Sequence, residues 1–260
     1  MKIIVAMKQV PGRDSALAVR ADGRWIEEHD LTFEINEPDA YALEEALQLK
    51  EKHGGEVIAL SLGPERTGQT LREALAKGAD RAIHVETDME ADANALDSLV
   101  VARLLSAAAA AEKPDLILTG LQSDDVGAGQ TGVIMAELLG MPHSTIVMQV
   151  TVEGTSLRVK RELEDGWFQF IAMPLPAVLT VQSGLNKLRY ATLMGIKKAK
   201  TKELRRVTPA ELGIEQKASV ATLEKLYQPQ KTKQSQLLTG DAKAVAAQVA
   251  EKLRHEARVI

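Results

Sequence analysis

Short runs of β-branched and aliphatic residues alternate along the chain with longer segments in which apolar residues recur every three or four positions. A run of the first kind predicts a strand, and a segment of the second kind predicts an amphipathic helix. The expected strands cover 2–7, 56–62, 81–85, 115–119 and 144–152, and the expected helices cover 38–52, 70–77, about 91–111 and about 130–139. This alternation predicts an α/β fold, a mainly parallel sheet with helices on both faces.

The pattern is different in two other regions. Residues 17–33 contain two alternating segments around Asp22-Gly23, which predicts a hairpin. After Thr151 the chain contains shorter pieces that look antiparallel, at 156–163, 167–172 and 177–181.

The end of the chain is expected to form an arm. Residues 228–236 are rich in Gln, Lys and Thr and resemble a linker. A final amphipathic helix places four apolar residues at helical spacing: Ala242, Val245, Val249 and Leu253. We therefore expect an α/β body over 1–210 and an arm over 211–260, whose apolar stripe requires a partner surface.

Several function classes are disfavoured by composition. The chain has no cysteine, which excludes disulfides, thiolate metal sites and iron–sulfur ligation. Its five histidines are scattered without metal-ligand or catalytic-triad spacing, so we expect no metal site and no catalytic residue. No apolar run reaches the ~20 residues of a membrane span, and the first strand lacks the features of a secretory leader. Because the chain has no cysteine, a reducing, cytoplasmic location is expected.

One glycine-rich segment has the chemistry of a phosphate site. Gly127, Gly129 and Gly132 have the spacing G-x-G-x-x-G and precede a predicted helix, whose free N–H groups attract phosphate. The segment does not follow the first strand, so a mononucleotide phosphate is favoured over a full NAD site. The alternative interpretation is a flexible turn and helix cap that bind no ligand. Asp124 and Asp125 are candidates for acid–base chemistry, a metal, a ribose contact or simple solvation.

A denser pattern follows in the second half of the chain. It reads VKRELEDG over 159–166, LPAVLTV over 175–181, NKLRYATL over 186–193 and IKKAK over 196–200. Further landmarks are KQVP at 8–11, NEPD at 36–39, QTG at 130–132 and the separate C-terminal helix. Together they resemble the beta subunit of electron transfer flavoproteins over essentially the whole chain.

The resemblance implies a heterodimer with an alpha subunit, which holds most of the redox FAD, and an AMP in the beta subunit. Gly127, Gly129, Gln130, Thr131 and Gly132 would then face the phosphate. Asp124 or Asp125 would face the ribose or nearby backbone, and Ala6, Lys8 and Asn36 would line the adenine.

Two alternatives remain. In flavin-bifurcating members of the family a second FAD takes the AMP position; the Gln-Thr-Gly ending at 130–132 is more similar to the AMP type, while the preceding residues match neither type. A stand-alone adenine-nucleotide sensor is the other alternative. The favoured role is an electron carrier without catalysis of its own, which shuttles electrons from flavin dehydrogenases, such as the acyl-CoA dehydrogenases of fatty acid oxidation, to a membrane quinone oxidoreductase or another acceptor.

The same resemblance places Glu162 near the alpha subunit and its flavin. It also makes 190–200 the loop that docks dehydrogenases, through Tyr190, Leu193 and Ile196. Leu188 and Lys197 depart from the usual Pro and Met of the family. Both lie in or beside the docking loop, so these departures concern the identity of the partner rather than membership of the family. A basic run follows, and it is interpreted as a solvated face or a surface that steers acidic partners: Lys197, Lys198, Lys200, Lys202, Arg205 and Arg206. A nucleic-acid patch is disfavoured, since aromatic residues are few and the net charge is −4.

Overall fold

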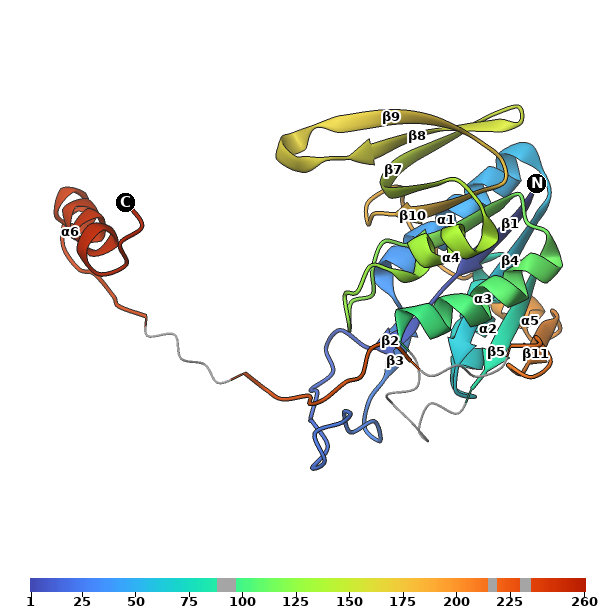
Figure 1. Cartoon of the computed structure of the whole chain (residues 1–260), viewed down its shortest axis with the longest axis horizontal. Helices are drawn as coiled ribbons and strands as arrows, with labels where there is room; N and C mark the ends of the chain where they lie inside the picture. The colour runs from blue at the N-terminus through green and yellow to red at the C-terminus, as the bar shows by residue number, and fades with distance from the viewer. Residues whose placement is uncertain (88–96, 215–218, 230–234) are drawn as a thin grey trace. The chain divides into compact units, whose positions relative to one another are not determined.

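The computed structural model describes residues 1–87, 97–214, 219–229 and 235–260. They form two compact units, Met1–Leu226 and Tyr227–Ile260. The strands of the main sheet are β1 (Lys2–Ala6), β4 (Glu56–Gly63), β5 (Arg81–Glu86), β6 (Leu116–Gly120), β7 (His143–Glu153), β8 (Ser156–Glu162), β9 (Phe168–Pro174), β10 (Ala177–Val181) and β11 (Leu204–Val207). Their order across this nine-stranded sheet is β11-β5-β4-β1-β6-β10-β7-β8-β9 (Figure 1).

The sheet is parallel from β11 to β7, and only β8 and β9 pair antiparallel at one edge. This confirms the expected α/β fold. The expectation for 177–181 was wrong, because β10 is parallel to both of its neighbours, β6 and β7. After β7 the chain makes the β8–β9 hairpin and returns to fill the position between β6 and β7.

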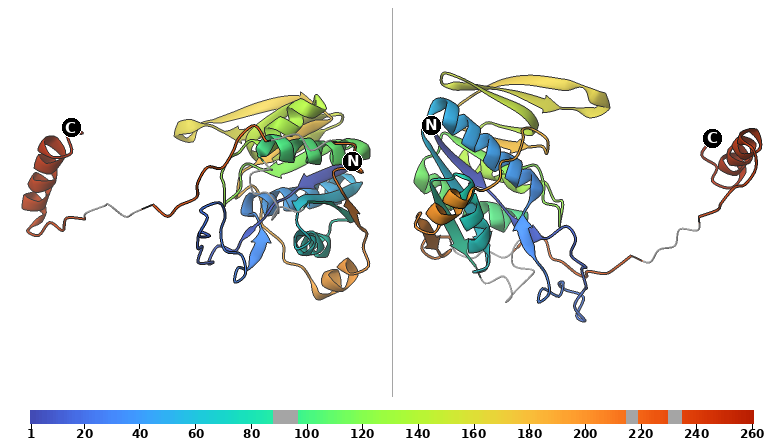
Figure 2. Two further views of the ribbon diagram at one scale, coloured as in Figure 1. Left: turned by 60° about the horizontal axis from the view of Figure 1, so that its bottom comes forward. Right: turned by 180° about the vertical axis from the view of Figure 1, so that it is seen from behind.

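Helices cover both faces of the sheet (Figure 2). One face carries α1 (Glu37–His53) and α2 (Thr67–Lys77), and the other carries α3 (Ser98–Glu112) and α4 (Thr131–Leu139). Strand β1 shows why the buried positions of a central strand are apolar in succession. Ile3 and Val5 lie in one core cluster with the residues of α1 and α2, while Ile4 and Ala6 lie in the other with those of α3 and α4.

Helix boundaries follow local capping chemistry. Helix α1 has Pro38 in its first turn and ends at Gly54. Helix α3 begins after Asp97, whose carboxylate accepts a hydrogen bond from Val100 N at 2.9 Å. The helix expected over about 91–111 therefore starts at Ser98, and its expected beginning at 91–96 lies outside the described residues.

The hairpin expected over 17–33 forms only in its central part, around Asp22-Gly23. There Val19 and Ile26 form an antiparallel bridge, Arg20 N donates to Trp25 O and Glu27 N donates to Ala18 O, each at 2.8 Å. The two ends of this segment are brought together by β2 (Gln9–Pro11), which pairs antiparallel with β3 (Phe33–Ile35). The short helix α5 (Leu193–Ala199) and strand β11 were not predicted from the sequence.

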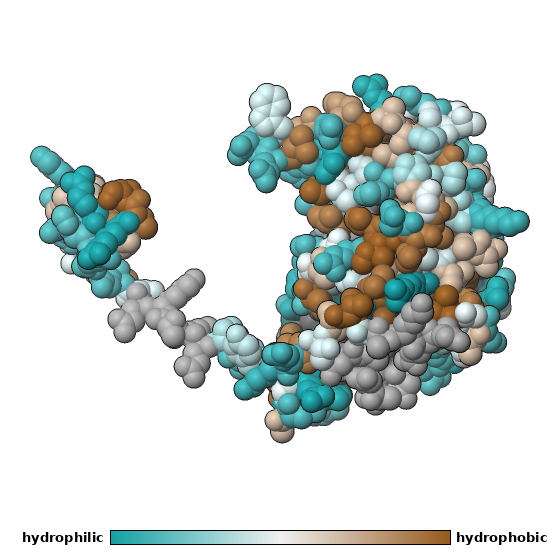
Figure 3. All heavy atoms as spheres, in the orientation of Figure 1, coloured by the Kyte–Doolittle hydropathy of each residue, from teal (hydrophilic) through white to brown (hydrophobic). Residues whose placement is uncertain are grey.

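The second unit contains the expected C-terminal helix, α6 (Ala242–His255), capped by Asp241. None of its residues is buried, and Val249 and Leu253 are exposed. Figure 3 shows apolar side chains gathered on one side of this C-terminal unit. Residues 220–226 lie beyond the expected boundary at 210 but belong to the first unit. Their backbone is hydrogen-bonded to it, since Val220 N donates to Asp97 and Leu226 N donates to Gly23 O.

Candidate nucleotide site and docking loop

The carboxyl ends of β1 and β6 lie side by side, with Ala6 opposite Thr119. Ala6 itself is buried in the core. Just beyond the strand ends, Lys8 Nζ lies 2.7 Å from Asp125 Oδ1. The amide of Asn36 donates to Gln122 O at 3.0 Å and accepts from Asp124 N at 2.9 Å. Candidate residues far apart in the chain thus meet at the carboxyl ends of the strands, which is where ligands of parallel sheets bind.

The two adjacent carboxylates are engaged with the protein rather than simply solvated. Asp124 Oδ2 accepts from Glu37 N at 3.2 Å, at the start of α1. Asp125 accepts from Lys8 and from Val126 N. Burial raises the pKa of Asp125, but the charge of Lys8 and its hydrogen bond outweigh burial and leave this pKa below its ordinary value. These contacts anchor the start of the glycine-rich loop to β1 and α1.

A third carboxylate, Asp39, joins the same elements. Its Oδ2 accepts from Lys8 N and its Oδ1 from Gly120 N, each at 2.7 Å, and the side chain is buried. Sequence reasoning gave Asp39 no role, because an acidic residue in the first turn of a helix already has a common explanation in the helix dipole. Burial raises its pKa to about 6, against the opposing effect of the two backbone hydrogen bonds.

Asp39 should make stability depend on pH. The folded state holds its proton up to about pH 6, whereas the ordinary pKa is 3.8. The unfolded state therefore binds fewer protons across that interval, and stability falls as pH rises through it, by roughly 3 kcal/mol at most. We expect Asp39→Asn to lack this slope, so its melting temperature relative to wild type rises between pH 5 and pH 7.

The check is thermal unfolding of both proteins at several pH values, with Asp14→Asn as the control at an exposed aspartate. A melting-temperature difference between Asp39→Asn and wild type that stays constant with pH would contradict the assignment.

The glycine-rich turn presents an open helix start. Gly127 and Gly129 have φ values of +66° and +63°, which side chains rarely adopt. Gln130 is the N-cap of α4, and no side chain there accepts from the helix N–H groups. The first turn of α4 has no acidic residue. The free N–H groups at this end of α4 therefore suit an anion such as phosphate.

Because Gly132 has no side chain, the start of α4 can pack closely against the sheet. A Cβ at this position would lie 2.6 Å from Thr119 Oγ1 and 2.7 Å from Thr180 Cγ2. The Oγ1 of Thr180 is itself buried without a hydrogen-bond partner in the described part of the chain. Thr131 is the first residue of α4 and is half-buried. The donors and the close backbone approach fit the phosphate of a nucleotide.

The segment expected to dock partners is strongly exposed. The exposed fractions are 93% for Tyr190, 89% for Leu193 and 47% for Ile196. Leu193 begins α5, and Thr192 caps this helix by accepting from Gly195 N at 3.0 Å. These three apolar side chains therefore lie on the surface and not in the core.

A second exposed apolar surface lies on the β8–β9 hairpin. Trp167 is 72% exposed and Phe170 57% exposed. Glu162 ends β8 opposite Phe168, and the ammonium of Lys160 lies 3.7 Å from the centre of the Phe168 ring. The predicted flavin-side residue thus lies within an apolar and cationic hairpin surface.

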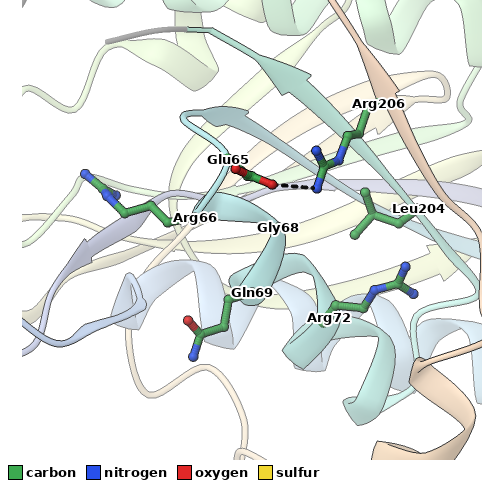
Figure 4. Close-up of a pocket in the computed structure, with 7 residues that line it drawn as sticks. All are labelled: Glu65, Arg66, Gly68, Gln69, Arg72, Leu204 and Arg206. Atoms are coloured by element: carbon green, nitrogen blue, oxygen red, sulfur yellow. Dashed lines mark ion pairs between the residues drawn. The ribbon is translucent and has the colours of Figure 1, made fainter. Parts of the chain in front are cut away.

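Other features carry less chemistry. A groove of about 320 Å³ beside α2 contains three arginines, but Arg66 binds Glu28, Arg72 binds backbone carbonyls and Arg206 pairs with Glu65 (Figure 4). Within the described residues, no group of His, Cys, Asp and Glu is arranged to hold a metal ion. None of the helices in the described ranges combines the length and apolar character needed to cross a bilayer.

Comparisons with known proteins agree with this arrangement. The family model for the electron transfer flavoprotein domain matches residues 24–212. The electron transfer flavoprotein subunit beta of Methylophilus methylotrophus is 38% identical over 240 residues, 89% of this chain and 90% of that protein. The human subunit beta is 40% identical over 233 residues, 89% of this chain and 91% of that protein. The mitochondrial subunit beta of Oryza sativa subsp. japonica is 37% identical over the full length of both chains. This chain belongs to the electron transfer flavoprotein family, as a homologue of its beta subunits.

Proposed function

We propose that this chain is the beta subunit of a heterodimeric electron transfer flavoprotein that carries electrons and binds AMP as a structural nucleotide. The observation that carries the nucleotide assignment is the uncapped start of α4 beneath Gly127 and Gly129. Backbone N–H groups of Gly129, Gln130, Thr131 and Gly132, with the Thr131 hydroxyl, would hold the phosphate. Asn36 and Lys8 fix the loop that carries them.

A second FAD in the same position is the alternative, and it would make the chain a subunit of a flavin-bifurcating protein. The open turn accepts the phosphate of either nucleotide. The experiment that separates them is mass spectrometry of the nucleotide released from the purified heterodimer. AMP is expected; FAD beyond one per heterodimer would favour bifurcation.

Gly129→Val is expected to lower the AMP content of the heterodimer by at least roughly tenfold, because a β-branched residue at φ near +63° forces the turn to rearrange and moves its N–H groups. The visible flavin spectrum should persist. Gly140→Val is the matched control, since Gly140 has the same φ of +63° at the other end of α4 and no neighbour within 4 Å. Equal nucleotide loss in both variants would contradict a site at the turn, and a parallel loss of flavin would identify the nucleotide as FAD.

The alpha subunit would hold most of the redox FAD, which supplies the one- and two-electron chemistry when bound. The exposed hairpin aromatics and the stripe of α6 support a large partner surface on this chain. Glu162 would approach the alpha subunit and its flavin from the hairpin. Among the described residues no cluster of His, Cys, Asp and Glu is arranged to hold a metal ion. We assign no catalytic residue to the chain alone. A stand-alone sensor needs neither surface; stable, monomeric behaviour of the separately expressed chain in size-exclusion chromatography would favour it.

Electrons would enter from flavin dehydrogenases, acyl-CoA dehydrogenases among them, that dock on Tyr190, Leu193 and Ile196. They would leave to a membrane quinone oxidoreductase or another acceptor. In this proposal the chain does not insert into the membrane and does not bind nucleic acid. The exposure of these three side chains supports the docking role. A cytoplasmic location remains part of the proposal, and the rice relative is named as mitochondrial.

A further inference from the structure

The segment that leads into the docking loop is bonded along α1. The amide of Asn186 donates to Tyr41 O at 3.2 Å and to Glu45 Oε2 at 3.1 Å. The guanidinium of Arg189 donates from Nε and Nη2 to the two oxygens of Glu44, at 2.7 and 3.0 Å. Its Nη1 also donates to Glu51 Oε1 at 2.6 Å. Arg189 thus bridges two carboxylates, Glu44 and Glu51, that lie about two turns apart on α1.

The buried carboxylates of Glu44 and Glu45 on α1 need hydrogen-bond partners of this kind. Glu44 is 4% exposed and Glu45 8% exposed, and unpaired buried charges are costly. Burial raises the pKa of Glu44, but hydrogen bonds from Arg189 and Gln48 leave it below its ordinary value. Burial also raises the pKa of Glu45, where the single amide of Asn186 compensates only in part. Glu44 is therefore the charged acceptor that the planar fork of Arg189 fits.

The other end of the loop is fixed to α2. Arg72 Nη1 donates to Ala199 O at 2.6 Å and to Lys202 O at 2.8 Å. The ammonium of Lys202 donates to Leu75 O and Ala79 O. Gly195 lies so close to α2 that an added Cβ would clash with Ala76 O. The exposed side chains of Tyr190, Leu193 and Ile196 lie between these two attachments.

We propose that Arg189 is a positioning residue for partner docking, which acts through Glu44 and Glu51 to fix the loop in its binding geometry before a partner arrives. The inference rests on the proposed docking role of Leu193. Ordering a flexible loop on binding costs free energy, and a loop already ordered in the free protein avoids this cost. Arg189 itself is too enclosed by α1 to serve as the main contact; its side chain is 30% exposed.

The first test needs no partner. In the purified heterodimer, Arg189→Gln is expected to raise hydrogen–deuterium exchange of the amides of 190–196 by at least roughly tenfold, because local opening becomes easier. Exchange in β1, β4 and the rest of the core should not change. Arg24→Gln removes the same charge at an exposed position and is the matched control. Unchanged exchange over 190–196 in Arg189→Gln would overturn the positioning role.

The second test measures electron transfer from an acyl-CoA dehydrogenase reduced by its acyl-CoA substrate. Arg189→Gln should raise the KM for the heterodimer roughly tenfold with kcat nearly retained, since saturation selects the ordered loop. Arg189→Lys keeps the charge but not the fork, and should recover only part of the loss. Full recovery with Lys, or an equal KM increase in Arg24→Gln, would show a charge effect and overturn the inference.

Coupled variants show whether Arg189 acts through the named residues. Glu44→Gln should raise KM like Arg189→Gln, and the double variant should be no worse than either single variant. In a Leu193→Ala background, Arg189→Gln should cause little further increase in KM. Additive effects in either cycle would contradict the proposal. A normal KM for Leu193→Ala would instead remove the docking role itself, a failure that is separate from the exchange result.

Discussion

Replacing Leu193 with Ala is expected to slow flavin reduction by an acyl-CoA dehydrogenase by roughly 10- to 150-fold. Leu193 is 89% exposed, so its side chain is available to a partner and contributes little to the core. Burying one leucine in a partner pocket stabilises a complex by about 1.5–3 kcal/mol, and each 1.4 kcal/mol is about tenfold in affinity. Reduction of the flavin by dithionite should remain normal, because a small reductant needs no docking surface.

Thermal unfolding separates docking from packing for Leu193. A surface substitution changes stability by about ±0.5 kcal/mol, whereas a core leucine truncated to Ala costs about 2–5 kcal/mol. Leu138→Ala is the control, because Leu138 is 46% exposed and lies in the last turn of α4, outside the docking loop and the C-terminal arm. A large drop in melting temperature with an intact transfer rate would defeat the docking assignment.

Deleting the residues after Gln236 is expected to weaken binding of the alpha subunit by at least roughly 100-fold, since a few buried anchors dominate most interfaces. The deletion removes α6, whose Val245, Val249 and Leu253 share one face and have no buried position within this chain. The unit Met1–Leu226 should keep its fold and its nucleotide. The measurement is the dissociation constant of the co-purified heterodimer, by dilution followed by size-exclusion chromatography.

Point variants of α6 test the same idea without a deletion. Leu253→Ser should weaken binding of the alpha subunit, while Glu251→Ser on the opposite, polar side of α6 should not. An unchanged dissociation constant for both the deletion and Leu253→Ser would show that α6 does not contact the alpha subunit.

The sequence predicted those elements whose signals are local. The runs of 56–62 and 115–119 are apolar at successive positions because helices cover both faces, and both became parallel strands. Strand β10 was placed wrongly because its partners, β6 and β7, are decided by the return path of the hairpin rather than by its own residues. Helix α5 was missed because it is short, contains Gly195 and depends on contacts with α2.

The candidate site shows the same division. The glycine spacing was visible in the sequence, and the docking loop was expected from the resemblance to the family. The role of Asp39 was not, because its donors, Lys8 N and Gly120 N, come from residues far away in the chain. The pairing of Arg189 with Glu44 is equally non-local, and no sequence pattern around either residue indicates the other as its partner. Contacts of this kind depend on tertiary packing, which residue types alone do not specify.

Strand β10 also determines the order of events during synthesis. Its partners β6 and β7 are translated first, yet they cannot join until Val181 has left the ribosome, because β10 lies between them. Such non-local pairing slows folding, and meanwhile the open edges of β6 and β7 invite association with other chains. Strands β7, β8 and β9 can pair with one another earlier, but they join the rest of the sheet only through β10. We therefore expect a nascent chain arrested before Ala177 to aggregate and the alpha subunit to join only after β10 is inserted.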